Sequence, residues 1–182
     1  MRKSVAILAL IAAASAAPAQ TPGERLVQAR PAGFVVGHTV SAPEASIEER
    51  IPQGESVQRW TRMLTTQRFA ATALRLRPEQ VLLRMASSLP KGCPGGKTGP
   101  IRTFTVVGRP AAEFRADCPR NPAHGGPETF FARAIAGASD VHIVQVAFRR
   151  VPSPADAAFA RAHLDSVALC TGAAKTGPCA GR

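Results

Sequence analysis

The chain carries four cysteines, all in its second half: Cys93, Cys118, Cys170 and Cys179. An even number of cysteines in an exported chain predicts a disulfide framework, which restricts the folds that the backbone can adopt. We favour the pairing that follows chain order, Cys93 with Cys118 and Cys170 with Cys179, although four cysteines also allow two other pairings. No Cys-x-x-Cys motif or paired-histidine spacing is present, so the sequence predicts no metal site.

Residues 1–19 have the layout of a secretory signal peptide. Arg2 and Lys3 precede the apolar run Val5–Ala14, and the small residues Ala17-Pro18-Ala19 form a cleavage signal. The run is shorter than the roughly 20 residues that a membrane-spanning helix needs. We therefore predict a periplasmic or secreted mature protein, a single α+β domain over 20–182 with no transmembrane segment.

The formal net charge is +11, and the loss of Arg2 and Lys3 with the signal leaves about +9, almost all of it from arginine. Such a charge favours acidic partners, and an anionic component of the cell envelope is the partner class that it predicts. The chain has no tyrosine and one tryptophan, Trp60. This is poor equipment for stacking bases, so the sequence argues against specific nucleic-acid binding. Nothing in it predicts a cofactor.

Strand-like runs dominate the pattern. Two precede residue 52 and four follow residue 100: Gly33–Val40, Ile47–Ile51, Ile101–Val107, Ala112–Cys118, Glu128–Ile135 and Val141–Arg149. Turn signals separate the last four, which predicts an antiparallel meander. Val144, Val146 and Phe148 are expected on one face of the last strand. The segment Thr21–Pro31 has no such pattern and is expected to be a loose lead-in.

Three segments are expected to be helical. Ser56 is a candidate N-cap, and the apolar residues that follow fit one helical face: Val57, Trp60, Met63 and Leu64. A second helix is expected to start at Pro78 and to end at Pro90. A third begins after Ser153, with Phe159, Ala162, Ser166 and Val167 facing inward and Cys170 near its end. An antiparallel sheet flanked by helices is an α+β fold.

Three stretches resemble a group of small exported proteobacterial proteins of unknown function. They are Gly54–Met63 with Thr65–Gln67, then Cys118–Pro122 with Gly126–Glu128, and Val144–Arg149. The resemblance extends over roughly residues 33–170. It implies a Mog1/PsbP-like α/β/α sandwich, an architecture of binding and accessory proteins without a shared chemistry. It assigns a function to no individual residue.

The leading functional hypothesis is a non-enzymatic binding or accessory protein of the cell envelope. No catalytic motif is present, so no catalytic residue is predicted. The candidate ligand-binding residues are Trp60, which could line a groove between sheet and helix, the basic strip of Arg59, Arg62 and Arg68, and the loop residue His124.

Two alternatives stay open. An exported hydrolase could use His124 with Asp117 or Glu128 as its acid and base, and convergence of Glu113, Asp117 and Glu128 would suit glycoside hydrolysis. A structural envelope component could instead assemble through an exposed edge of the sheet.

Overall fold

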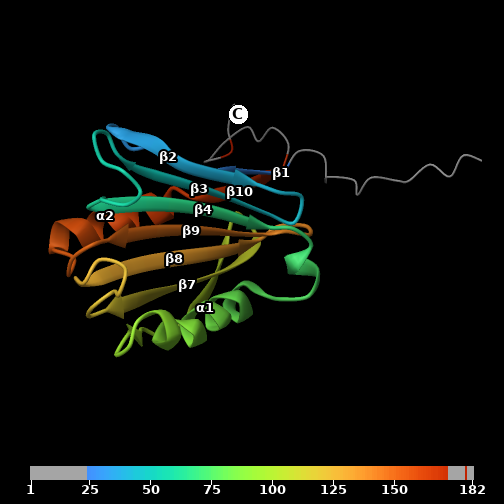
Figure 1. The fold of residues 1–182 in the computed structure, drawn as a ribbon. Helices are drawn as coiled ribbons and strands as arrows, with labels where there is room; N and C mark the ends of the chain where they lie inside the picture. Colours follow the sequence, from blue (N-terminus) through green and yellow to red (C-terminus); the bar gives the residue numbers. More distant parts are fainter. Residues whose placement is uncertain (1–23, 172–178, 180–182) are drawn as a thin grey trace, which may run out of the picture.

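The computed structural model describes residues 24–171 and Cys179. Its centre is an eight-stranded antiparallel sheet with the neighbour order β2-β3-β4-β9-β8-β7-β5, and β6 also pairs with β7. The helices α1 (Pro78–Gly92) and α2 (Pro154–Asp165) pack on opposite faces of this sheet (Figure 1). This α+β architecture with two disulfides confirms the predicted fold class.

The strands and one short 3-10 helix, η1, have the following bounds: β1 Glu24–Val27, β2 Phe34–Ser41, β3 Ala45–Pro52, β4 Arg62–Phe69, η1 Thr72–Leu74, β5 Lys97–Thr98, β6 Arg102–Val106, β7 Arg109–Cys118, β8 Glu128–Ala136, β9 Val141–Phe148 and β10 Ala168–Thr171. The predicted strands all exist, and β6, β7, β8 and β9 form the predicted antiparallel meander. Neither described helix is long and apolar enough to cross a membrane.

Strand β9 lies at the centre of the sheet and is buried on both faces. Val144, Val146 and Phe148 belong to the core under α2, as predicted, whereas Val141 and Ile143 belong to the core under α1. Successive side chains of a strand point to opposite faces, so a strand that is covered on both sides is apolar almost throughout. This is why β9 is such a clear strand in the sequence.

The two helices begin where the sequence predicts, for local reasons. Ser153 caps α2 by accepting a hydrogen bond from the backbone N–H of Asp156, whose carboxylate accepts one from the Ser153 backbone N–H. Helix α1 begins at Pro78 but continues past Pro90 to Gly92, so Pro90 does not end it. The final turn is held because the Cys93 N–H donates to the Leu89 carbonyl at 2.8 Å and Cys93 is disulfide-bonded.

The prediction of a helix after Ser56 is wrong. The structure has a tight turn bridging Ser56 and Arg59, followed by strand β4 from Arg62. Met63 and Leu64 are both buried because β4 is covered on both faces, Met63 on the α1 side and Leu64 on the α2 side. Two consecutive buried residues fit a helical face and a central strand equally well. The spacing of apolar residues therefore could not distinguish a helix from a strand here.

Two segments without a predicted strand, Glu24–Val27 and Ala168–Thr171, pair with each other in the structure. The supposed lead-in contains β1, which pairs with β10 over four residues to form a second, two-stranded sheet. Cys170 lies in β10 and not at the end of a helix, because α2 ends at Asp165. The loop expected between Cys170 and Cys179 falls at 172–178, outside the described residues.

Both disulfides follow the predicted chain order. Cys93 pairs with Cys118, with the two Cα atoms 5.8 Å apart, and thereby ties the end of α1 to the end of β7. Cys170 pairs with Cys179, with the two Cα atoms 5.5 Å apart, and thereby ties Cys179 to β10. Disulfides persist in oxidising compartments, so the pair fits an extracytoplasmic location.

Candidate functional site

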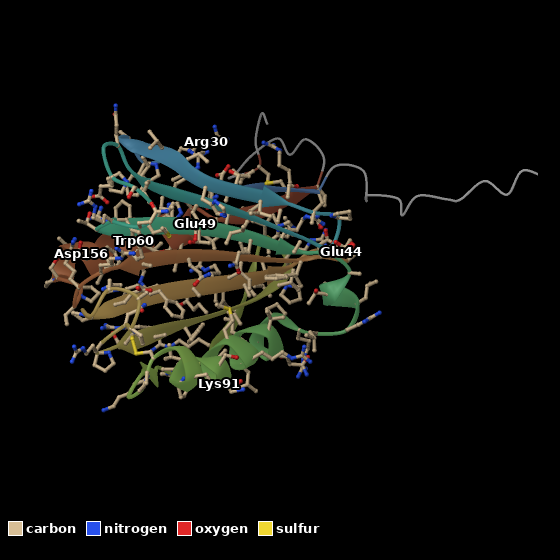
Figure 2. The ribbon with its side chains drawn as sticks, in the orientation of Figure 1. Arg30, Glu44, Glu49, Trp60, Lys91 and Asp156 are labelled. Atoms are coloured by element: carbon tan, nitrogen blue, oxygen red, sulfur yellow. A yellow bond between two sulfur atoms is a disulfide. The ribbon has the colours of Figure 1, made fainter. Side chains whose placement is uncertain are left out.

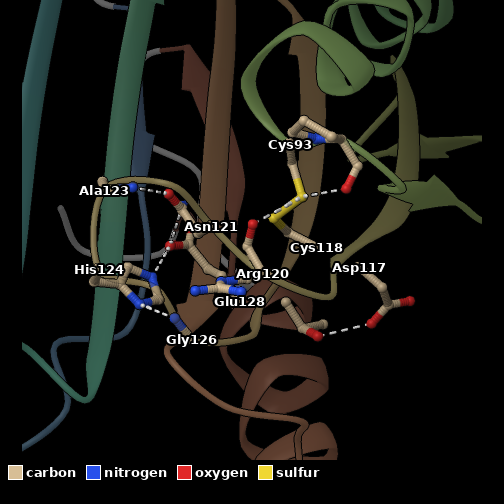
Figure 3. The surroundings of a disulfide bond; sticks show 11 residues. Cys93, Asp117, Cys118, Arg120, Asn121, Ala123, His124, Gly126 and Glu128 are labelled. Atoms are coloured by element: carbon tan, nitrogen blue, oxygen red, sulfur yellow. Dashed lines mark hydrogen bonds and ion pairs between the residues drawn. A yellow bond between two sulfur atoms is a disulfide. The ribbon is translucent and has the colours of Figure 1, made fainter.

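His124 and Glu128 meet in the loop between β7 and β8. The His124 Nε2 lies 3.1 Å from Glu128 Oε2, and Asn121 Nδ2 donates to the same carboxylate oxygen at 2.9 Å (Figure 3). The backbone N–H of Gly126 donates to His124 Nδ1 at 3.3 Å. Since Nδ1 accepts, Nε2 must carry the proton that is donated to Glu128. Both ring nitrogens therefore fasten the loop, and neither is left to take a proton from a substrate.

The three candidate carboxylates do not converge. Glu113 is bonded to Arg133 at 2.8 Å, and Asp117 accepts from Arg115 and Thr129. Glu113 and Asp117 are four residues apart on one strand, about 13 Å at the usual rise of a strand. Glu128 pairs in register with Cys118, so it lies on the opposite face of the sheet from both. This geometry excludes the paired arrangement that glycoside hydrolysis requires.

Trp60 is part of a small core and not the wall of a helix–sheet groove. It is only 8% exposed and packs with Ile51, Met63 and Ala147. The Arg149 guanidinium covers its ring, with Cζ 4.4 Å from the ring centroid. Its remaining edge borders a shallow, mostly polar hollow of about 310 Å³ on the sheet, where Glu49 lies (Figure 2). A covered tryptophan offers a ligand little surface for stacking.

The predicted basic strip does not exist. Arg59 is exposed in the turn before β4, whereas Arg62 and Arg68 lie within that strand. Arg62 is bonded to Asp156 at 3.1 Å, and Arg68 is bonded to Asp140 at 2.9 Å. The strip depended on a helix at this position, and both of its strand residues are already neutralised by carboxylates.

The arrangement best suited to bind a ligand is a cavity of about 520 Å³ between α2 and strands β6, β7 and β8, which we call the α2 cavity. Its apolar lining comes from Phe131 on the sheet and from Ala157, Ala158 and Leu164 on the helix. The small alanines leave room between helix and sheet. The volume falls in the usual range for sites that hold small molecules.

The rim of the α2 cavity is basic. Arg102, Arg115 and Arg161 line it together with Glu113. Glu113 is already bonded to the buried Arg133, and Arg161 lies 3.7 Å from its other oxygen.

Arg115 pairs with Asp117, and its Cζ lies 5.4 Å from the centroid of the Phe131 ring. Arg102 is exposed and has no carboxylate within ion-pair distance among the described residues. The cavity thus combines an apolar floor with surplus positive charge at its entrance.

Sequence reasoning missed this site. The rim arginines come from three elements, β6, β7 and α2, and α2 is distant from the other two along the chain. In addition, the residues of α2 that face the sheet differ from those that the sequence predicts. Ala160, His163 and Leu164 are buried, whereas Ala162 is exposed. His163 of the same helix is only 3% exposed. One sequence pattern indicated part of the site: side chains alternate along β7, so Glu113 and Arg115 lie on one face of the strand.

No family model and no curated protein matches this chain. Among solved structures it is similar to CyanoP, the PsbP protein of the cyanobacterium Synechocystis, with a TM-score of 0.54 and 7% identity over 87% of this chain and 99% of that one. The chain has a PsbP-like fold. This confirms the architecture that the resemblance implies, and at such low identity it shows the fold alone.

Two further solved structures resemble the chain more weakly. A protein of unknown function from Pseudomonas aeruginosa has a TM-score of 0.42 and 17% identity, with 67% of this chain and 86% of that chain covered. LpqN of Mycobacterium tuberculosis, which is involved in cell envelope biogenesis, has a TM-score of 0.41 and 11% identity, with 81% and 85% covered.

Proposed function

We propose that the chain is an exported, non-enzymatic binding or accessory protein of the cell envelope, and that its α2 cavity holds an anionic amphiphile. One observation carries the proposal: an apolar cavity floor lies directly beside a rim of arginines. An acidic head group would pair with Arg102 and Arg161, while an apolar body would cover Phe131 and Ala157. The proposal thereby specifies the predicted anionic envelope partner as an acidic lipid or a related amphiphile.

Export is part of this proposal. It is supported by the signal-like residues 1–19 and by the two disulfides, which need an oxidising compartment. We assign the mature protein to the periplasm or the extracellular space, as a single domain over 20–182.

The hydrolase alternative has no comparable support. His124 would have to act with Asp117 or Glu128, yet its Nδ1 already accepts the Gly126 N–H. Its Nε2 is held by Glu128, and Asp117 is bonded elsewhere.

Calorimetric titration of the purified, oxidised protein with monomeric decyl phosphate tests the proposal, with uncharged octyl glucoside as the comparison ligand. We expect decyl phosphate to bind and octyl glucoside to bind far more weakly. Added salt should weaken the binding because the entrance contacts are ionic and partly exposed. A parallel titration with phosphatidylglycerol vesicles separates a free amphiphile from a membrane surface as the source of the ligand.

Three variants locate the binding. Arg102→Gln should weaken decyl phosphate binding about tenfold, the effect of losing a charge-assisted hydrogen bond. Ala157→Leu should narrow the cavity and weaken binding. Arg59→Gln removes an exposed arginine far from the cavity and should change only the weak long-range attraction. Binding that is insensitive to salt and to Arg102→Gln contradicts the proposal.

A further inference from the structure

A second cavity, of about 570 Å³, lies on the other flank of α2, and we call it the arginine cavity. One wall is the segment Arg25–Arg30, and the floor comes from strands β3 and β4 and from His163 of α2. The wall is fixed at both ends, because β1 pairs with β10 and the Ala29 N–H donates to Ser166 Oγ at 2.8 Å. Strand β9 separates β4 from β8, and the two cavities share no lining residue.

The arginine cavity is electropositive. Arg25, Arg30 and Arg50 line it, and its carboxylate, Glu48, accepts a 2.7 Å hydrogen bond from Arg50. Neither Arg25 nor Arg30 has an ion-pair partner in the part of the chain that the structure describes. Two exposed guanidinium groups are therefore available to bind an anion at this cavity, and Figure 2 labels Arg30.

Two residues that line the cavity, Gln28 and His163, carry buried polar atoms that lack hydrogen-bond partners within 24–171. His163 is 3% exposed, and neither Nδ1 nor Nε2 has a partner there. Gln28 donates from Nε2 to Thr66 Oγ1 at 2.7 Å, but its buried Oε1 has no partner. Buried polar atoms are nearly always hydrogen-bonded, so these atoms beside a cavity are suited to bind the polar groups of a small ligand.

The unpaired atoms define what that ligand must offer. Burial lowers the pKa of His163 to about 4, so the imidazole is neutral and supplies one donor and one acceptor. Gln28 Oε1 can only accept. The arginines call for an anionic group, and the acceptors call for a hydroxyl on the same molecule.

We propose that the arginine cavity binds a small hydroxycarboxylate, the class to which sugar acids also belong. Its carboxylate pairs with Arg25 and Arg30, and its hydroxyl donates to Gln28 Oε1 or to the acceptor nitrogen of His163. This site is independent of the amphiphile proposed for the α2 cavity, because the lining residues differ.

Malate and succinate form a matched pair of probes, since malate is succinate with one added hydroxyl. Calorimetric titration of the oxidised protein should show malate binding about fivefold more tightly, the effect of one additional hydrogen bond. The His163 imidazole resonances should shift on malate addition. No binding of either acid, or equal affinity for the two, overturns the proposal.

Four variants assign the binding to this cavity. Arg30→Gln, at an exposed position that the fold does not depend on, should weaken both acids. Gln28→Met removes the acceptor and should reduce the preference for malate. Arg59→Gln and Arg102→Gln should leave malate binding unchanged, and the second also separates this result from that for decyl phosphate. Equal weakening by Arg30→Gln and Arg59→Gln would show diffuse charge attraction and would refute the site.

Discussion

Mild acid should destabilise this protein through His163. The side chain is buried, and its pKa falls from 6.5 to about 4 because burial disfavours the charged imidazolium. Between these values the unfolded chain binds a proton that the folded chain does not. Stability is therefore fully present above about pH 6.5 and is lost as the pH falls toward 4.

The size of the effect follows from the two pKa values. A shift from 6.5 to about 4 corresponds to about 3 kcal/mol in full, of which about 2 kcal/mol is lost between pH 7 and pH 5. Asp156 does not contribute in this window. The hydrogen bonds from Arg150 and Ser153 hold the pKa of its carboxyl well below the usual range, so it is protonated only in stronger acid.

Urea denaturation at pH 7 and pH 5 measures the effect, in buffers of equal ionic strength and without added ligand. His163→Phe preserves an aromatic ring beside Phe159, with which His163 stacks at 6.4 Å between centroids, and removes the titration. The variant should lose about 2 kcal/mol less than the wild type between the two pH values, whatever its stability at pH 7.

His38→Ala, at an exposed position on β2, is the matched control and should keep the wild-type pH dependence. His142 also has a pKa lowered by burial and is retained in every variant, so its contribution cancels in the comparison. The reasoning is refuted if His163→Phe and the wild type lose the same free energy of unfolding between pH 7 and pH 5.

Two further predictions concern the fold. Replacing Cys93 and Cys118 together by alanine opens a loop with a sequence separation of 25 and should lower the free energy of unfolding by roughly 3 kcal/mol. Chemical denaturation with the Cys170–Cys179 disulfide intact measures this loss of stability. An unchanged denaturation midpoint would contradict the stabilising role of the Cys93–Cys118 disulfide. Asp156→Ala should cost about 3 kcal/mol because it removes the α2 capping box and leaves two arginines without their buried carboxylate partner. Glu44→Ala, at an exposed position, is the control for Asp156→Ala. If the two variants lower the melting temperature by the same small amount, the stabilising role of Asp156 is refuted.

The elements that the sequence predicts correctly have local causes. Ser153 and Asp156 lie three residues apart and close the capping box within one turn of helix. Strand β9 is apolar on both faces, and its turn signals lie directly beside it. The cysteine pairing also follows chain order, so each disulfide closes the shorter loop.

The errors have one origin: the same residues suit different structures until distant partners are known. Met63 and Leu64 fit a helical face until β3 and β9 pair on either side of their strand. The polar β1 becomes a strand because β10 offers it a partner more than 140 residues later. His124 is attractive as a catalytic base until Gly126 and Glu128 occupy both ring nitrogens.

By itself, then, the sequence determined the α+β class, the strand-rich centre and the start of both helices, since each follows from patterns among residues that are close in the chain, and it favoured the disulfide pairing that the structure shows. Tertiary structure alone decided the two cavities. Arg102 and Arg161, or Arg30 and His163, share a cavity only after the sheet has assembled between them. Binding chemistry here depends on long-range convergence of charge and apolar surface, which no local pattern of residues records.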